Sequence, residues 1–285
     1  MKTKCPPDFI GIGAMRCGTT WISDKLRKHP EIFLPNNYKE LHFFDSHYKN
    51  GIEWYENNFL GKIDTQISGE FTPKYLRDDE SPFLIKNHYP NVKLIISIRN
   101  PVDRAFSHYN FLKKQLKISD NFYEALFDEN YEILKAGLYG QQIKTYLDLF
   151  PREKIHIIIF DDIKKTPYNV INELYNFLNV SSDFKPKNLE KIINQRREVR
   201  YRFLENLTRK TKRSIRPYIK NRNKLKNFGF HYLLGILNTI NSKKIIKKEI
   251  DYDTKNYLIE YYKNDFVILN KILDGKVAHW FNYEL

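Results

Sequence analysis

Cysteine is scarce in this chain, and several patterns that define protein classes are missing. Only Cys5 and Cys17 occur among 285 residues, so a disulfide framework is excluded and we expect reduced thiols. No apolar run approaches the roughly 18 residues of a membrane-spanning helix, and residues 1–7 lack the apolar core of a secretion signal. The eight histidines lack the i, i+4 spacing of a zinc site. We therefore expect a cytoplasmic protein with no transmembrane segment and no bound metal.

Acidic residues are rare in one segment, which carries the net positive charge of the chain. The chain has 48 Lys and Arg against 34 Asp and Glu, a net charge of +14. Residues 191–248 contain 18 of the basic residues but only Glu198 and Glu205 as acids. An anionic partner is expected near this segment: nucleic acid, acidic polysaccharide, a membrane surface or a nucleotide. The alternative is a solvated basic helix that binds nothing in particular.

Apolar runs that alternate with helical patterns define the expected core. Three such runs end at Gly13, Ile98 and Phe160, and a helical pattern follows each of them. Near-continuous apolar strands of this kind are typical of a parallel sheet that is covered on both faces. We predict a three-layer α/β protein, with a central parallel sheet, helices on both faces and a single domain. Its expected parts are a core at residues 8–180, a basic helical insertion at 184–250 and a C-terminal helix within 251–285 that returns to the core.

A glycine-rich turn without its expected lysine follows the first apolar run. Residues 13–20, GAMRCGTT, have the G-x-x-x-x-G spacing of a phosphate-binding loop, but Thr19 and Thr20 replace the Lys-Ser/Thr pair. Backbone N–H groups at such a turn bind phosphate-like anions, and Arg16 could reach the same anion. A tight turn without a ligand is one alternative. A degenerate P-loop kinase is another, with Asp161 and Asp162 as candidates for its magnesium ligand.

A second cluster joins Arg99, at the end of its predicted strand, to Ser107. Pro101 suits the first turn of the helix that follows, so Ser107 lies about two turns into that helix. An arginine and a hydroxyl that converge there could hold a second phosphate. Alternatively, Arg99 pairs with a carboxylate and Ser107 simply packs as a small residue.

A third cluster places Glu40 and His42 directly before the aromatic pair Phe43 and Phe44. A carboxylate beside aromatic side chains can be desolvated enough to accept a proton. A surface glutamate next to core phenylalanines is the ordinary alternative. A weaker strand at residues 66–68 would place Glu70 just beyond its end, at the sheet edge where ligands bind in such folds.

Together these clusters resemble the sulfotransferases that use 3′-phosphoadenosine 5′-phosphosulfate (PAPS). Residues 13–20 resemble their 5′-phosphosulfate loop, and residues 98–107, IRNPVDRAFS, resemble their 3′-phosphate motif. Residues 39–45, KELHFFD, followed by GIEWY at 51–55, are similar to the heparan sulfate (glycan) branch in particular. The likeness runs in order over residues 8–180 and 250–282, with further matches at 69–75, 137–142, 150–151, 177–178 and 277–281.

The resemblance implies a P-loop-NTPase-like sulfotransferase fold and a role for each matching residue. It implies that Arg16, Gly18, Thr19 and Thr20 bind the 5′-phosphosulfate and that Arg99 and Ser107 bind the 3′-phosphate, with Cys17 and Trp21 as further nucleotide-binding residues. Glu40 falls at the catalytic base, His42 lies near the acceptor, and Arg16 would stabilise the leaving group. The chain departs from the family at Arg16, where lysine is frequent. It also has Phe71 where the heparan sulfate branch has a second active-site lysine, with Lys74 nearby in the sequence.

The resemblance implies in-line transfer of a sulfuryl group from PAPS to a hydroxyl or amine, without a metal. The expected partners are the nucleotide donor and a carbohydrate-like acceptor, and residues 191–248 would suit an anionic one. The alternative from a different class is a non-enzymatic protein that binds nucleic acid or an acidic glycan through residues 191–248. We expect nucleic acid to be the less favoured partner, and the sequence predicts no oligomeric state.

Overall fold

The structure is a computed structural model that describes residues 5–36, 40–115, 118–189, 198–199, 242–243 and 249–281. The chain divides into two compact units: residues 1–192 together with 250–285, and residues 193–249. In the second unit, β6 (Glu198–Val199) and β7 (Ser242–Lys243) pair in an antiparallel ladder. Most of the basic helical insertion predicted at residues 184–250 lies outside the described residues.

A five-stranded sheet forms the centre of the first unit. Its strands lie in the order β2-β3-β1-β4-β5, and every neighbouring pair is parallel. All five residues of β1 are buried, as expected for a central strand that is covered on both faces. The strands are β1 (Phe9–Gly13), β2 (Ile32–Phe33), β3 (Ile67–Phe71), β4 (Lys93–Ile98) and β5 (Ile155–Ile159).

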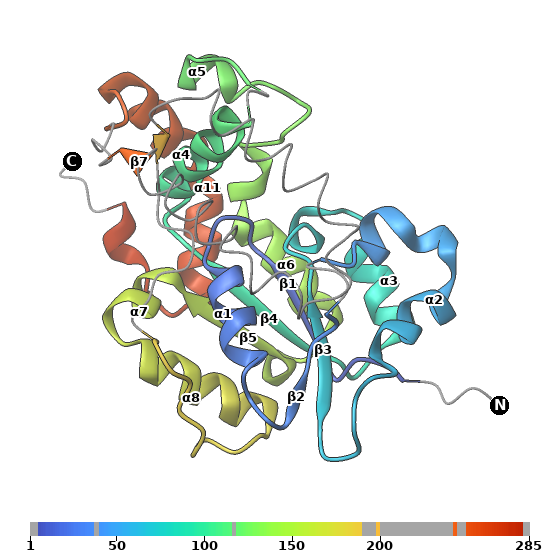
Figure 1. The fold of residues 1–285 in the computed structure, drawn as a ribbon. Helices are drawn as coiled ribbons and strands as arrows, with labels where there is room; N and C mark the ends of the chain where they lie inside the picture. The colour runs from blue at the N-terminus through green and yellow to red at the C-terminus, as the bar shows by residue number, and fades with distance from the viewer. Residues whose placement is uncertain are drawn as a thin grey trace, which may run out of the picture. The chain divides into compact units, whose positions relative to one another are not determined.

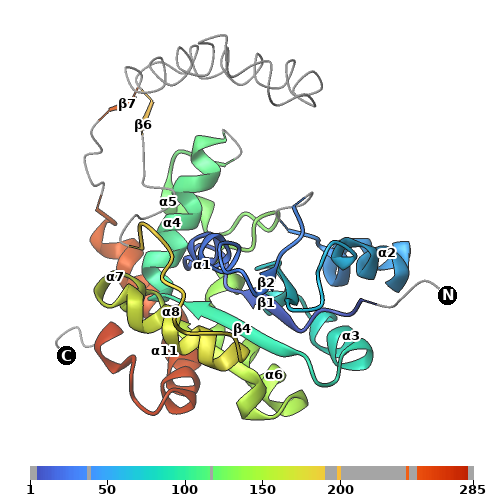
Figure 2. The ribbon, with the colours of Figure 1, turned by 60° about the horizontal axis from the view of Figure 1, so that its bottom comes forward.

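Helices cover both faces of this sheet, as Figures 1 and 2 show. In Figure 2, α1 (Thr19–Leu26) lies on one side, and α3 (Ser81–His88) and α6 (Tyr139–Leu149) lie on the other. Ile10 of β1 belongs to the same buried apolar cluster as Ile85 of α3 and Ile143 of α6. The predicted three-layer α/β architecture is confirmed. The other α-helices of the described residues are α2 (Ile52–Glu56), α4 (Pro101–Lys114), α5 (Phe122–Ala125), α7 (Phe160–Lys165), α8 (Pro167–Leu178) and α11 (Tyr252–Ile272).

Two strands differ from the expectation. β3 continues to Phe71, beyond the predicted end at residue 68, so Glu70 and Phe71 lie within the strand rather than after it. Glycine in β1 permits this extension, because a Cβ atom on Gly11 would lie 2.0 Å from the Phe71 ring. The short strand β2 was not predicted, because a two-residue strand has no detectable period. Among the described residues, no helix combines the length and apolar character needed to cross a membrane.

Helix α11 returns to the sheet and binds the start of α6. The Asp265 carboxylate accepts hydrogen bonds from the backbone N–H groups of Gly140 and Gln141, both at 2.8 Å. These N–H groups lie in the first turn of α6, where a helix supplies no partner of its own. Asp265 is buried, and this burial raises the pKa of its carboxyl. The C-terminal segment therefore caps a helix of the core.

We expect Asp265→Ala to lower the free energy of unfolding by roughly 2–4 kcal/mol, because a buried N–H group without a partner costs about 1–3 kcal/mol. Urea unfolding followed by circular dichroism measures this change. Glu260→Ala, an exposed substitution on the same helix, is the control and should change stability by less than about 0.5 kcal/mol. Equal stabilities of the two variants would contradict the capping role.

Candidate active site

The glycine-rich loop connects β1 to α1 at the centre of the sheet. Two of its residues have positive φ angles, 71° at Arg16 and 91° at Gly18. Residues of this kind turn successive backbone N–H groups toward one point, and the start of α1 adds the positive end of its dipole. Gly18 also permits close packing, because a Cβ atom there would lie 2.9 Å from the Phe160 ring. The loop therefore has the backbone geometry of an anion site.

The Arg16 side chain connects this loop to α4. Its Nε donates a hydrogen bond to the Ser107 hydroxyl at 3.4 Å, and its guanidinium lies 4.7 Å from the centre of the Phe111 ring. Ser107 itself is buried. The structure thus brings together two clusters that were separate in the sequence, the glycine-rich loop and the segment predicted to hold a second phosphate.

Arg99 follows β4 directly and lies beside the start of α4. Its guanidinium donates to Asp103 at 3.0 Å and stacks 5.1 Å from the centre of the Phe160 ring. The Arg99–Asp103 pair is the carboxylate contact that the sequence left open as an alternative. The Nε of Arg99, however, is buried with no hydrogen-bond partner in the described part of the chain. A phosphate oxygen fits this unmatched donor.

The other loop residues support the turn from inside. The thiol of the buried Cys17 lies 3.4 Å from the Tyr139 hydroxyl, and burial raises the pKa of this thiol. Trp21 is almost fully buried, and its indole N–H donates to the carbonyl of Leu189 at 3.0 Å. Thr19 is buried and Thr20 half-buried at the start of α1. The residues that the sequence grouped as a nucleotide loop therefore lie in the turn after β1 and in the first turn of α1.

Glu40 and His42 lie in one chain of alternating charges. His42 Nε2 is 3.2 Å from Glu40 Oε2, and His42 Nδ1 is 3.0 Å from Asp45 Oδ2. The ammonium of Lys74 is 3.1 Å from the same Asp45 oxygen. Hydrogen bonds that His42 donates to the carboxylates of Asp45 and, to a smaller extent, Glu40 raise the pKa of His42 to about 9. Burial disfavours the charged form of Asp45, yet hydrogen bonds from His42 and Lys74 lower its pKa to about 2.

The backbone at His42 is held in an unusual conformation. Its φ angle is 51°, in the left-handed region, which costs a residue other than glycine roughly 1–2 kcal/mol. The π-helical turn Phe43–His47 follows, in which the His42 carbonyl accepts from Ser46 at 3.1 Å and His47 at 2.9 Å. Conformations of this kind persist where the surrounding structure enforces them, and they cluster at functional sites.

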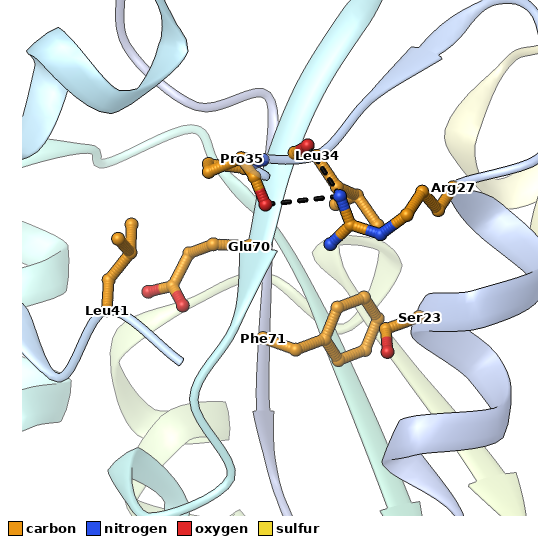
Figure 3. A pocket seen from close by; sticks show the side chains of 7 residues that line it. All are labelled: Ser23, Arg27, Leu34, Pro35, Leu41, Glu70 and Phe71. Carbon is orange, nitrogen blue, oxygen red and sulfur yellow. Dashed lines mark hydrogen bonds between the residues drawn. The ribbon is translucent and has the colours of Figure 1, made fainter. Parts of the chain in front are cut away.

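A pocket lies beside α1 and the end of β3, as Figure 3 shows. Its empty volume is about 250 Å³, part of which is open solvent. In Figure 3 the Glu70 carboxylate is turned toward Leu41, whereas the Phe71 ring is turned toward Ser23 of α1. Arg27 donates to the carbonyls of Leu34 and Pro35, at 2.8 and 3.1 Å. The pocket is lined by Ser23, Arg27, Leu34, Pro35, Leu41, Glu70 and Phe71.

Sequence reasoning missed the roles of Asp45 and Lys74 in this group. The signal for Asp45 was its place three residues after His42, within the motif that carried the resemblance. Lys74 contacts Asp45, while the Phe71 ring packs against β1 at Gly11. Lys39 lies outside the described residues.

Asp161, the magnesium-ligand candidate of the kinase alternative, is bound within the protein. It accepts a hydrogen bond from the Trp280 indole N–H at 3.1 Å and lies 3.6 Å from Lys164. Its carboxylate therefore helps to fix the 3-10 turn Ala278–Trp280 beside α7.

Comparison with known proteins agrees with this arrangement. The model of the family described as sulfotransferase domain matches residues 6–226. The chain belongs to the sulfotransferase family. The resemblance inferred from the loop motifs is thereby confirmed at the level of the family.

Relatives of this chain include one protein from Dictyostelium discoideum and one from Mus musculus. Membrane-associated sulfotransferase kil1 of Dictyostelium discoideum is 27% identical, with 66% of this chain and 60% of kil1 covered. Heparan sulfate glucosamine 3-O-sulfotransferase 6 of Mus musculus is 29% identical over 179 residues, 60% of this chain and 52% of that protein. The chain thus spans between half and three-fifths of the length of these relatives.

Among solved structures, a sulfotransferase from Alicyclobacillus acidocaldarius has the same fold. Its TM-score is 0.70 at 24% sequence identity, with 96% of this chain and 98% of that chain covered. The likeness supports the α/β sulfotransferase fold and includes the sheet whose edge carries the candidate site.

We expect the stability of this sulfotransferase to fall between pH 6.5 and about 9 because of His42. The pKa of His42 is raised from 6.5 to about 9 in the folded protein, so its contribution is full below pH 6.5 and is lost as the pH rises through 9. His42→Gln should show a flatter loss of stability over this window in urea unfolding. His279→Gln, outside the charged group, is the control. The same pH slope in His42→Gln and the unsubstituted protein would rule out the ion pairs.

Proposed function

We propose that the chain is an enzyme that transfers a sulfuryl group from PAPS to a hydroxyl or amine of a carbohydrate-like acceptor. The observation that carries this proposal is the hydrogen bond between Arg16 and Ser107. It supports a site that binds both phosphate groups of one nucleotide, because Arg16 belongs to the loop for the 5′ group and Ser107 to the segment for the 3′ group. A nucleotide with both phosphates is the donor that distinguishes this family from ATP-dependent enzymes.

The cationic groups suit the donor and its leaving group. Arg99 has a buried N–H donor that would bind the 3′-phosphate together with the Ser107 hydroxyl. Arg16 and the N–H groups of the loop would stabilise the negative charge that develops on the bridging oxygen as the S–O bond breaks. The terminal sulfuryl group carries a single charge, which is consistent with a loop that lacks the lysine of nucleoside triphosphatases.

Glu40 is the proposed general base. It would take the proton from the acceptor hydroxyl or amine, whose oxygen or nitrogen then attacks sulfur in line with the departing 3′-phosphoadenosine 5′-phosphate (PAP). His42 contacts Glu40 and is itself bound by Asp45, so the imidazole orients the carboxylate rather than accepting the proton. Lys74 contacts Asp45 and balances the charge at the far end of the group.

The carbohydrate acceptor rests on similarity to the glycan branch of the family. Two mouse relatives are named for their action on heparan sulfate glucosamine, and each shares its matching segment with this chain at 29% identity. A transfer screen with radiolabelled PAPS across glycans, lipids and phenols would identify the acceptor. We also propose a cytoplasmic location, which cell fractionation would check.

PAP should stabilise the protein against thermal unfolding, because a ligand that binds only the folded state at 100 times its Kd adds about 2.7 kcal/mol. Ser107→Ala should reduce the preference for PAP over adenosine 5′-phosphate about tenfold or more, since it removes a donor to the 3′-phosphate. Ser119→Ala, at an exposed serine, should leave this preference unchanged. No thermal shift at millimolar PAP would refute the proposed donor.

Glu40→Gln should lower kcat for sulfuryl transfer roughly 10²- to 10⁴-fold, the usual contribution of a general base. The affinity for PAP, measured by calorimetry, should stay the same because the glycine-rich loop is unchanged. Glu53→Gln, at an exposed glutamate, is the matched control. Full activity of Glu40→Gln would exclude Glu40 as the base while leaving the family assignment intact.

A further inference from the structure

Four consecutive backbone N–H groups, from Leu41 to Phe44, donate to only two side-chain hydroxyls. The Thr72 hydroxyl accepts from Leu41 at 3.1 Å and from His42 at 3.2 Å. The Tyr75 hydroxyl accepts from Phe43 at 2.8 Å and from Phe44 at 3.4 Å. This segment lies between Glu40 and Asp45, the two carboxylates that His42 bridges. Its path is therefore set by side chains that follow β3.

The direction of the Thr72 hydrogen bonds is determined by simple counting. A threonine hydroxyl has two acceptor sites and one hydrogen, and the two N–H groups occupy both acceptor sites. The hydrogen must then be donated, and it points to Glu70 Oε2 at 2.7 Å. The other oxygen of Glu70 accepts from the Tyr55 hydroxyl at 3.3 Å. Thr72 and Glu70 are both buried, so water does not replace these bonds.

Glu70 acts here through its acceptor oxygen, not through its charge. Burial raises its pKa to about 7, while the hydrogen bond from Thr72 opposes that rise. A neutral carboxyl still has an oxygen that accepts a hydrogen bond, so both protonation states can receive the Thr72 hydrogen. A glutamine at this position would also retain such an oxygen.

Thr72 is also fixed to the strand that leads into the glycine-rich loop. Its backbone N–H donates to the carbonyl of Gly11 in β1 at 2.9 Å. Thr72 therefore contacts β1 through its backbone N–H group, and it contacts Leu41 and His42 through its hydroxyl. A shift of Thr72 would move the Glu40 group relative to the loop.

We propose that Glu70 and Thr72 are positioning residues for the transfer reaction. Glu70 orients the Thr72 hydroxyl, and this hydroxyl holds the N–H groups of Leu41 and His42, which keeps His42 in its left-handed conformation between Glu40 and Asp45. The kinetic part of this inference rests on the proposed function. The geometric part does not, because the ion pairs of His42 can be measured without any turnover.

Thr72→Val and Thr72→Ser form the test pair, since valine has the shape of threonine without its hydroxyl and serine retains the hydroxyl. Thr72→Val should lower kcat roughly 10- to 100-fold, the effect expected when catalytic groups are displaced by up to about 1 Å. Thr72→Ser should stay within about threefold of the unsubstituted protein, and both should bind PAP with unchanged affinity. Thr145→Val, at a half-buried threonine on α6 outside the candidate site, is the control for the substitution itself.

The titration of His42, followed by NMR of ¹³C-labelled histidine, separates positioning from a general loss of stability. The groups that act on the charge of His42 are Glu40, Asp45 and Glu70, with Lys74 bound to Asp45, and neither Thr72 substitution changes them. The pKa of His42 should fall from about 9 toward its ordinary value of 6.5 in Thr72→Val and stay near 9 in Thr72→Ser. Unchanged titration and kcat in Thr72→Val would overturn the proposal.

A second pair keeps the test decisive if Thr72→Val does not fold. Both Glu70→Gln and Glu70→Met remove the carboxylate that acts on His42. Glu70→Gln keeps an acceptor for the Thr72 hydroxyl and should retain a higher His42 pKa and a higher kcat than Glu70→Met, which lacks it. Equal His42 titrations in the two Glu70 variants would also overturn the positioning role. If the unsubstituted protein transfers no sulfate but these titration differences appear, the proposed function fails and the positioning role stands.

Discussion

The candidate site depends on the central place of β1 in the sheet. This strand pairs with β3 on one side and β4 on the other, so three connecting segments leave the sheet at the same edge. Those segments carry Arg16, Thr72 and Arg99. Glycine at positions 11 and 13 permits the close approach, because a Cβ atom at either would overlap the side chain of Phe71 or Leu76. Residues larger than glycine at positions 11 and 13 would move the charged group that contains Glu40 and His42 away from the glycine-rich loop.

The site divides its charges into two groups with different effects. At the loop, Arg16 and Arg99 stack on Phe111 and Phe160, which orient the guanidinium groups, and Asp103 also pairs with Arg99. Near β3, acids and bases alternate from Glu40 to Lys74, so that group largely balances its own charge. In the proposed reaction an anionic donor would therefore be attracted to the loop, while Glu40 would lie close to the reacting atoms without repelling that donor strongly.

The sequence was most informative where one physical signal dominates. Continuous apolar runs located β1, β4 and β5, and the spacing of apolar residues located α11, because burial on two faces or along one stripe leaves such patterns. The contact of Arg16 with Ser107 spans 91 residues of chain and has no local signature. Glu70 resembled a loop residue because it is charged, yet it lies buried in β3. Its carboxylate accepts hydrogen bonds from the hydroxyl groups of Tyr55 and Thr72, and the spacing of apolar residues in the sequence does not predict such contacts.

The cap that Asp265 places on α6 also affects how the first unit is completed during synthesis. Residues 193–249 leave the ribosome between the two parts of that unit. Until Asp265 has emerged, the first amides of α6 lack their buried acceptor, although the whole sheet has already been made. The first turn of α6 therefore has no cap until residues 193–249 and then Asp265 in α11 have been synthesised. A chaperone that shields the exposed face of α6 during that interval would favour correct folding.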